Sequence, residues 1–130
     1  MPSIEAPQGK QAAGPRTALI VEDNVIIAME IDLFLEDFGV ANRFVAGTVE
    51  NALLVLQVRE IGFAIVDVDL GAETSEDVAL ALHARGLPFI FSTGYDVQEP
   101  MVARFPDAPV LMKPFSADML YRALRDLGVG

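Results

Sequence analysis

Five polar side chains follow four short apolar runs, and their types suit metal and phosphoryl chemistry. Glu22 and Asp23 follow TALIV, Asp67 follows FAIV, Thr93 follows LPFIFS and Lys113 follows VLM. Runs of this length are typical of buried strands, and the carboxyl ends of parallel strands share the edge of a sheet where ligands bind. We therefore expect the five side chains to converge, although they are far apart in the sequence.

Three carboxylates at one place repel one another unless a cation or a lysine neutralises them. The acids Glu22, Asp23 and Asp67 therefore predict a hard metal ion held by oxygen ligands. The hydroxyl of Thr93 and the ammonium of Lys113 beside that metal suit a phosphoryl group. Taken singly, each residue has a simpler explanation, because acids and hydroxyls after strands often cap helices and a lysine can pair with any acid. The ordered set favours the binding site.

Composition and charge exclude several classes of function. The 130 residues suit one domain with its own core, and the absence of cysteine excludes thiol chemistry. The formal charge of -10 repels nucleic-acid phosphates and anionic lipid. No apolar stretch approaches the roughly 20 residues of a membrane span. We expect a soluble, cytoplasmic protein without a direct nucleic-acid or membrane partner.

From Thr17 onward the chain alternates apolar runs with stretches of helical periodicity. Residues 1–16 mix Pro, Gly, Gln and Ala without periodicity, so we expect a flexible extension there and one domain over residues 17–130. The alternation is typical of repeated βα units and predicts an α/β fold with helices on both faces of a parallel sheet. The expected strands lie near residues 17–22, 41–46, 62–67, 87–92 and 109–112.

Helix starts and apolar stripes are visible between these runs. The expected N-caps are Asn24, Thr48 and Ser116, and Thr74 with Asp77 is similar to a capping box for the third helix. Pro100 is expected to start a short fourth helix near residues 99–105. The residues expected to face the core are Ile27, Ile31, Phe34, Leu35 and Phe38, then Ala52, Leu53 and Leu56, then Val78, Leu80, Ala81 and Leu82, and finally Leu120, Ala123, Leu124 and Leu127.

The ordered set of site residues resembles the phosphorylation site of response-regulator receiver domains of two-component signalling. In that family an acidic pair follows the first strand, an Asp the third, a Ser or Thr the fourth and a Lys the fifth. The match covers about residues 17–128 and places Glu22–Asp23, Asp67, Thr93 and Lys113 at those positions. The resemblance implies a flavodoxin-like, doubly wound (βα)5 fold whose five-stranded parallel sheet has the strand order 2-1-3-4-5.

The resemblance also implies a role for each residue. Asp67 would be the phosphoacceptor, Lys113 would neutralise the transferred group, and the Thr93 hydroxyl would donate a hydrogen bond to a phosphoryl oxygen. The ligands of Mg²⁺ would be Glu22, Asp23, Asp67 and the backbone carbonyl of Asp69. The donor would be a sensor histidine kinase or a histidine phosphotransfer protein. The outcome would be controlled binding of a downstream protein, or a relay or sink for phosphate, without turnover of other substrates.

The segment Pro88 to Tyr95, PFIFSTGY, resembles the signature of the receiver subgroup called FAT GUY, with Ser92 in the place of Ala. Many members of that subgroup are stand-alone receivers phosphorylated by kinases of the HWE or a related type, which implies such a partner here. The aromatic residue that ordinary receivers carry on the fifth strand is replaced by Val110. We therefore expect a switch through Tyr95 and the fourth crossover, with Gly94 leaving space for the phosphoryl group.

The segment that follows Asp67 leaves an enzyme alternative open. DVD at residues 67–69 resembles the Asp-x-Asp motif of haloacid dehalogenase-type phosphatases, in which Asp69 would be the acid. A third interpretation is a pseudo-receiver that binds partners without phosphorylation. For a receiver, we predict that Asp69 affects the lifetime of the phosphoryl group because its side chain borders the path of attacking water. Gly71 is expected to give this loop its flexibility.

Overall fold

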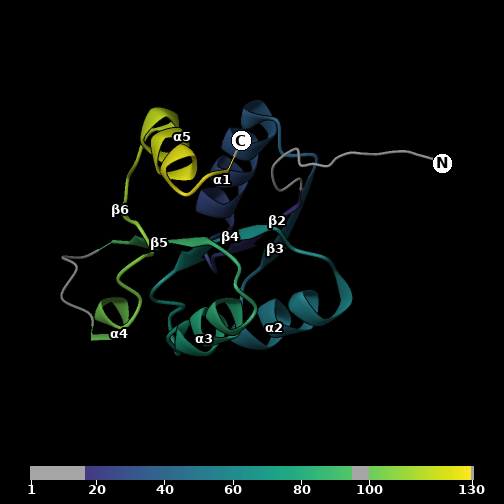
Figure 1. Ribbon diagram of the computed structural model, residues 1–130, viewed down its shortest axis with the longest axis vertical. Helices are drawn as coiled ribbons and strands as arrows, with labels where there is room; N and C mark the ends of the chain where they lie inside the picture. The colour runs from purple at the N-terminus through teal and green to yellow at the C-terminus, as the bar shows by residue number, and fades with distance from the viewer. Residues whose placement is uncertain (1–16, 95–99, 130) are drawn as a thin grey trace.

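The computed structural model describes residues 17–94 and 100–129, which form a five-stranded parallel sheet between two helical layers (Figure 1). The strands are β2 (Thr17–Val21), β3 (Asn42–Ala46), β4 (Phe63–Asp67), β5 (Phe89–Thr93) and β6 (Val110–Met112). The helices are α1 (Val25–Phe38), α2 (Val49–Val58), α3 (Glu76–Ala84), α4 (Pro100–Ala103) and α5 (Ala117–Asp126). The expected extension over residues 1–16 lies outside the described residues.

The order of strands across the sheet is β3-β2-β4-β5-β6, which is 2-1-3-4-5 when the strands are counted along the chain. All neighbouring pairs are parallel, so the predicted flavodoxin-like fold is confirmed. The strand ranges also agree closely with the prediction. The largest difference is at β5, which begins at Phe89 rather than near residue 87 and continues through Thr93.

Two separate cores lie on the two faces of the sheet, because side chains alternate along each strand. In Figure 1, α1 and α5 lie above the sheet, and α2, α3 and α4 lie below it. Ile20, Ile65 and Ile90 face α1 and α5 within one cluster of buried side chains. Val66 and Phe91 belong to the other cluster, beside α2 and α3. All residues of β4 and β5 are buried, as expected for central strands of a parallel sheet.

The predicted helix starts after β2, β3 and β6 are confirmed by their capping bonds. Asn24 Oδ1 accepts hydrogen bonds from the backbone N–H groups of Ile26 and Ile27, at 3.0 and 3.1 Å. Thr48 Oγ1 and Ser116 Oγ each accept one such bond in their helices. Gly39 ends α1 with φ of 104°, a left-handed conformation that glycine adopts without strain. These caps fix where α1, α2 and α5 begin.

The third helix differs from the prediction at its start and along its inner face. Its N-cap is Ser75 rather than Thr74, and no side chain caps it; Ser75 Oγ donates instead to the backbone carbonyl of Val68 at 3.4 Å. Ala79 is buried, whereas Leu80 is half exposed. Val78, Ala79 and Leu82 lie on one side of α3, whereas Leu80 lies about 200° around the helix axis from Val78 and so points away from the sheet.

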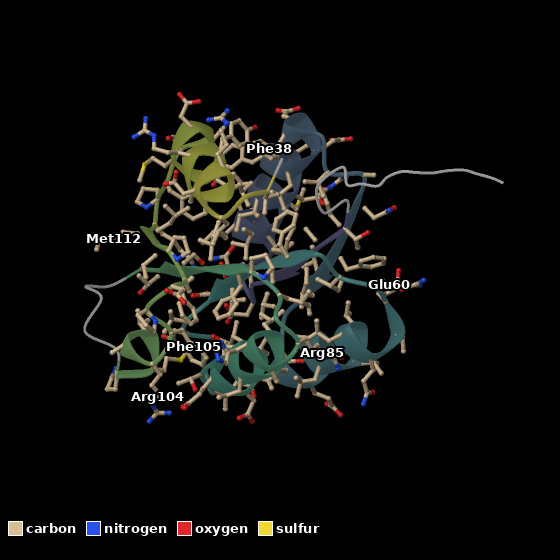
Figure 2. The ribbon with its side chains drawn as sticks, in the orientation of Figure 1. Phe38, Glu60, Arg85, Arg104, Phe105 and Met112 are labelled. Atoms are coloured by element: carbon tan, nitrogen blue, oxygen red, sulfur yellow. The ribbon has the colours of Figure 1, made fainter. Side chains whose placement is uncertain are left out.

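In the described part of the fourth crossover, residues 100–109, the helix is the short α4, which Pro100 begins as predicted. Phe105, labelled in Figure 2, follows α4 and is buried. Its ring makes edge contacts with Phe89, Phe91 and His83. Arg104, labelled beside it in Figure 2, pairs with the carboxylate of Glu76 on α3. Residues 104 and 105 of the crossover therefore contact α3 and β5. Among residues 17–94 and 100–129, no helix is long and apolar enough to cross a membrane.

Candidate functional site

The three predicted acids meet at the carboxyl edge of the sheet. Glu22 and Asp23 directly follow β2, and Asp67 is the last residue of the neighbouring strand β4. One carboxylate oxygen from each residue lies within 4.8 Å of the other two. Glu22 and Asp67 are buried, while Asp23 is exposed. This donor set, all oxygen and open to solvent at Asp23, fits a hard divalent cation.

Lys113 directly follows the edge strand β6, and its side chain forms ion pairs with the two buried acids. Its Nζ lies 2.8 Å from Glu22 Oε1 and 2.9 Å from Asp67 Oδ2. The backbone N–H of Lys113 donates to the carbonyl of Thr93 at 2.7 Å, which continues the β5–β6 pairing beyond β6. The predicted convergence of the acids with Lys113 is therefore confirmed.

Thr93 and Gly94 stand at the end of β5, between the acids and Lys113 in the strand order. Thr93 is buried, and Gly94 is exposed. A Cβ placed on Gly94 would meet no atom of residues 17–94 or 100–129 within 4 Å. Its role beside an incoming phosphoryl group stays a prediction. Tyr95, the expected switch residue, lies outside the described residues.

The loop after β4 is held by hydrogen bonds rather than being loose. The backbone N–H of Asp69 donates to Asp67 Oδ1 at 3.2 Å, and Asp69 Oδ1 accepts from the backbone N–H of Gly71 at 3.0 Å. Gly71 has a φ of 84°, and a Cβ there would lie 3.3 Å from Asp23 Oδ2. A larger residue at this position would therefore press on the acidic group. The glycine gives space as well as the backbone freedom that the sequence indicated.

Burial and charge act in opposite directions on the ionisable groups. Burial raises the pKa of Glu22; its hydrogen bonds to Lys113 and the Asn24 backbone lower it again in part, and the charge of Asp67 adds to the increase. Burial lowers the pKa of Lys113, but its contacts with Glu22 and Asp67 outweigh this and raise the pKa overall. Three acids against one ammonium leave excess negative charge, which a cation would relieve.

The sequence interpretation missed a groove beside these acids. A cavity of about 520 Å³ lies between α1 and the edge strand β3 and reaches Glu22 and Asp23. Its apolar lining includes Met29 and Leu33 of α1, whose exposed fractions are 60% and 57%, and Val45 of β3 at 50%. The available signal was a second apolar stripe at helical spacing, Val25, Met29 and Leu33, beside the stripe that packs on the sheet.

Searches of protein-family models and of curated proteins find no match for this chain. Solved structures do match. The solution structure of SdrG from Sphingomonas melonis Fr1 is 43% identical, with a TM-score of 0.76 over 87% of this chain and 96% of that one. The BeF3-activated conformation of SdrG from Pseudomonas melonis Fr1 is also 43% identical, with a TM-score of 0.73 over 88% and 97% of the two chains.

A further match is the signal receiver domain of a modulated diguanylate cyclase from Desulfovibrio desulfuricans G20. It is 32% identical, with a TM-score of 0.73 over 85% of this chain and 90% of that one. The parallel sheet order, the acids at its carboxyl edge and these similarities define a CheY-like receiver fold. The chain belongs to the response-regulator receiver domains.

Proposed function

We propose that this receiver domain accepts a phosphoryl group on Asp67 from a phosphohistidine, in a reaction that depends on Mg²⁺. The donor is a sensor histidine kinase, of the HWE or a related type, or a histidine phosphotransfer protein in the cytoplasm. Phosphorylation then controls binding of a downstream protein, or the domain relays or stores phosphate. The observation that carries this proposal is the pairing of Lys113 with both Asp67 and Glu22, at 2.9 and 2.8 Å.

The chain supplies the groups that the transfer needs. An oxygen of Asp67 attacks phosphorus while the bond from phosphorus to the histidine nitrogen breaks, and the electron pair leaves with the imidazole. Lys113 neutralises charge on the phosphoryl oxygens, and Thr93 donates a hydrogen bond to one of them. Glu22, Asp23 and Asp67 would hold Mg²⁺, which supplies further charge neutralisation when bound. No separate base is required, because the attacking carboxylate carries no proton.

The phosphatase alternative requires Asp69 to act as an acid toward a leaving group. One oxygen of its carboxylate accepts a bond from the Gly71 backbone, and Asp69 does not belong to the group of three converging acids. This arrangement favours a phosphoacceptor without turnover of other esters. In the pseudo-receiver alternative Lys113 has only a structural role, as the counter-charge of two buried acids. Both alternatives predict no stable label on Asp67.

The groove between α1 and β3 supports a protein partner close to Asp67. Met29, Leu33 and Val45 expose apolar surface, and Glu22, Asp23 and Asp32 line the same cavity with negative charge. A helix that presents apolar residues flanked by lysines or arginines would complement this surface. We propose that the phosphodonor protein docks here.

Incubation with a phosphorylated histidine kinase, with and without Mg²⁺, tests the function. Wild-type protein is expected to take up one phosphoryl group per chain only when Mg²⁺ is present. Asp67→Asn should remain unlabelled, while Asp77→Asn, which changes an exposed acid on α3, should be labelled like wild type. Repeated turnover of a generic phosphate ester, abolished by Asp69→Asn, would instead establish the phosphatase. An absence of label under every condition would favour the pseudo-receiver.

A further inference from the structure

Ser92 on β5 carries a buried hydroxyl with no hydrogen-bond partner in the part of the chain that the structure describes. Its exposed fraction is 1%, and within residues 17–94 and 100–129 its Oγ has no hydrogen-bond partner. Ser75, equally buried, differs because its Oγ donates to the carbonyl of Val68. A buried hydroxyl left unpaired lowers stability, so such a group calls for a physical explanation. For Ser92 the surroundings suggest one.

Ser92 lies between the two strands that carry Asp67 and Lys113. It pairs with Asp67 across β4 and β5, and with Leu111 across β5 and β6. Strand alternation places its side chain on the sheet face of Ile90 and Leu111, which pack in the α1 and α5 layer. By the same alternation Asp67 shares this face, because it lies two residues beyond Ile65 in β4.

Lys113 must cross β5 to reach Asp67. It follows β6, whereas Asp67 ends β4, and β5 lies between them (Figure 1). Two strand spacings separate β4 from β6, roughly 10 Å, yet Nζ reaches Asp67 Oδ2 at 2.9 Å. The lysine side chain therefore spans the end of β5 on the face that carries the hydroxyl of Ser92. The hydroxyl of Ser92 is therefore on the same face of the sheet as the ion pair of the site.

The Lys113 ammonium has three N–H donors. One donates to Asp67 Oδ2, and Glu22 Oε1 lies 2.8 Å from Nζ as the second ion-pair partner. Carboxylates are stronger acceptors for an ammonium than a neutral hydroxyl is, so they hold it away from Ser92. A cation that neutralised these acids would weaken their attraction for the Lys113 ammonium. The ammonium could then turn toward a phosphoryl oxygen. An N–H group directed toward β5 would then need another acceptor.

We propose that Ser92 is a positioning residue for Lys113 in the phosphorylated site. Its Oγ accepts a hydrogen bond from the ammonium when Lys113 turns from a carboxylate to a phosphoryl oxygen. The hydroxyl is thus unpaired in the resting domain and paired in the loaded one, which favours the loaded state. This inference rests on the proposed phosphoacceptor function and adds a residue to it.

Beryllofluoride with Mg²⁺, as a mimic of the phosphoryl group, tests the role of Ser92 through stability. Urea unfolding would be measured for wild type, Ser92→Ala and Ser75→Ala, with and without the mimic. Ser92→Ala is expected to be as stable as wild type or more stable without the mimic, but to need roughly tenfold more beryllofluoride for half-saturation. Ser75→Ala is expected to lose stability equally in both states, because its hydrogen bond does not depend on the site.

Ser92→Thr keeps the hydroxyl, so this variant should bind the mimic to within about twofold of wild type. If Ser92 had only a structural role, the Thr and Ala variants would not differ in their affinity for the mimic. Equal half-saturation for wild type and Ser92→Ala would overturn the role of Ser92 while leaving the phosphoacceptor function intact. A wild-type protein that gains no stability from the mimic would overturn the proposed function, and this inference with it.

Discussion

Lys113 and Asp67 are separated by 46 positions in the chain, and their Nζ and Oδ2 atoms lie 2.9 Å apart. The contact exists because the lysine side chain spans the width of β5 between the ends of β4 and β6. The same ammonium lies 2.8 Å from Glu22, so one positive charge serves two buried carboxylates. The stability of the resting domain and its capacity to bind a cation both depend on this arrangement.

Replacement of Lys113 by Met would keep most of the side-chain volume and remove the charge. Two buried carboxylates would then face each other uncompensated, and we expect the free energy of unfolding to fall by roughly 3 kcal/mol. Millimolar Mg²⁺ should recover part of this loss. Urea unfolding checks the prediction, with Arg122→Met on the exposed side of α5 as the control. An unchanged stability, or a loss that Mg²⁺ does not reduce, would contradict it.

Mg²⁺ is expected to raise the melting temperature, because an ion that binds only the folded state stabilises it. The gain is about 2.7 kcal/mol at one hundred times the dissociation constant. Asp23→Asn removes one of the three converging acids and should reduce the gain strongly. Asp118→Asn, at an exposed position in the first turn of α5, should respond like wild type. Thermal unfolding at several Mg²⁺ concentrations measures this, and an absent shift for wild type would count against the site.

The raised pKa of Glu22 predicts a pH dependence for the metal-free domain. Between its ordinary value of 4.5 and the raised folded value, the folded state binds more protons than the unfolded state. The free energy of unfolding of the wild type therefore falls as the pH rises through this window and Glu22 loses its proton. The stability of Glu22→Gln relative to wild type should increase from pH 4.5 upward and then level off.

Urea unfolding of both proteins in the presence of a chelator measures this difference. Added Mg²⁺ should shrink it, because the ion favours the charged carboxylate. A difference that stays constant across the pH range would show that burial of Glu22 does not govern its titration.

Met29→Asp would place a negative charge in the groove between α1 and β3. We expect transfer from a phosphorylated kinase to slow by about tenfold or more, because a central interface side chain is worth 1 kcal/mol or more. Labelling by a small acyl phosphate should be unaffected, since that donor needs no docking surface. Leu54→Asp, at an equally exposed apolar residue of α2, is the matched control. If the two substitutions slow transfer from the kinase equally, the groove is not the docking site of the phosphodonor.

Asp69→Ala is expected to lengthen the lifetime of the phosphoryl group several-fold. The side chain is exposed beside Asp67 and carries a carboxylate that can accept a proton from attacking water. The backbone bond from Asp69 to Asp67 is kept in this variant, so labelling itself should persist. Dephosphorylation rates after removal of the donor test the idea, with Asp77→Ala as the control. Identical rates for wild type and Asp69→Ala would reject it.

The amino-acid sequence by itself determined the parallel sheet and, through the family resemblance, its strand order. It also determined that Glu22, Asp23, Asp67 and Lys113 meet at the carboxyl edge of the sheet. Each site residue follows a short apolar run, and the ends of parallel strands must share an edge, so local pattern was enough. The N-caps Asn24, Thr48 and Ser116 were also predictable, because capping depends on neighbouring backbone groups only. The start of α3 was not, since Ser75 bonds to Val68 across the loop instead of capping the helix.

Only the tertiary structure decided which charges pair and which apolar residues stay exposed. Lys113 could have paired with any acid, and the distance across β5 selects Glu22 and Asp67. Met29 and Leu33 are as apolar as the residues of the buried stripe, but β3 is the edge strand and nothing among the described residues covers them. The burial of the Ser92 hydroxyl without a hydrogen-bond partner among the described residues likewise depends on strand register. These features arise from contacts between distant segments, which local periodicity does not encode.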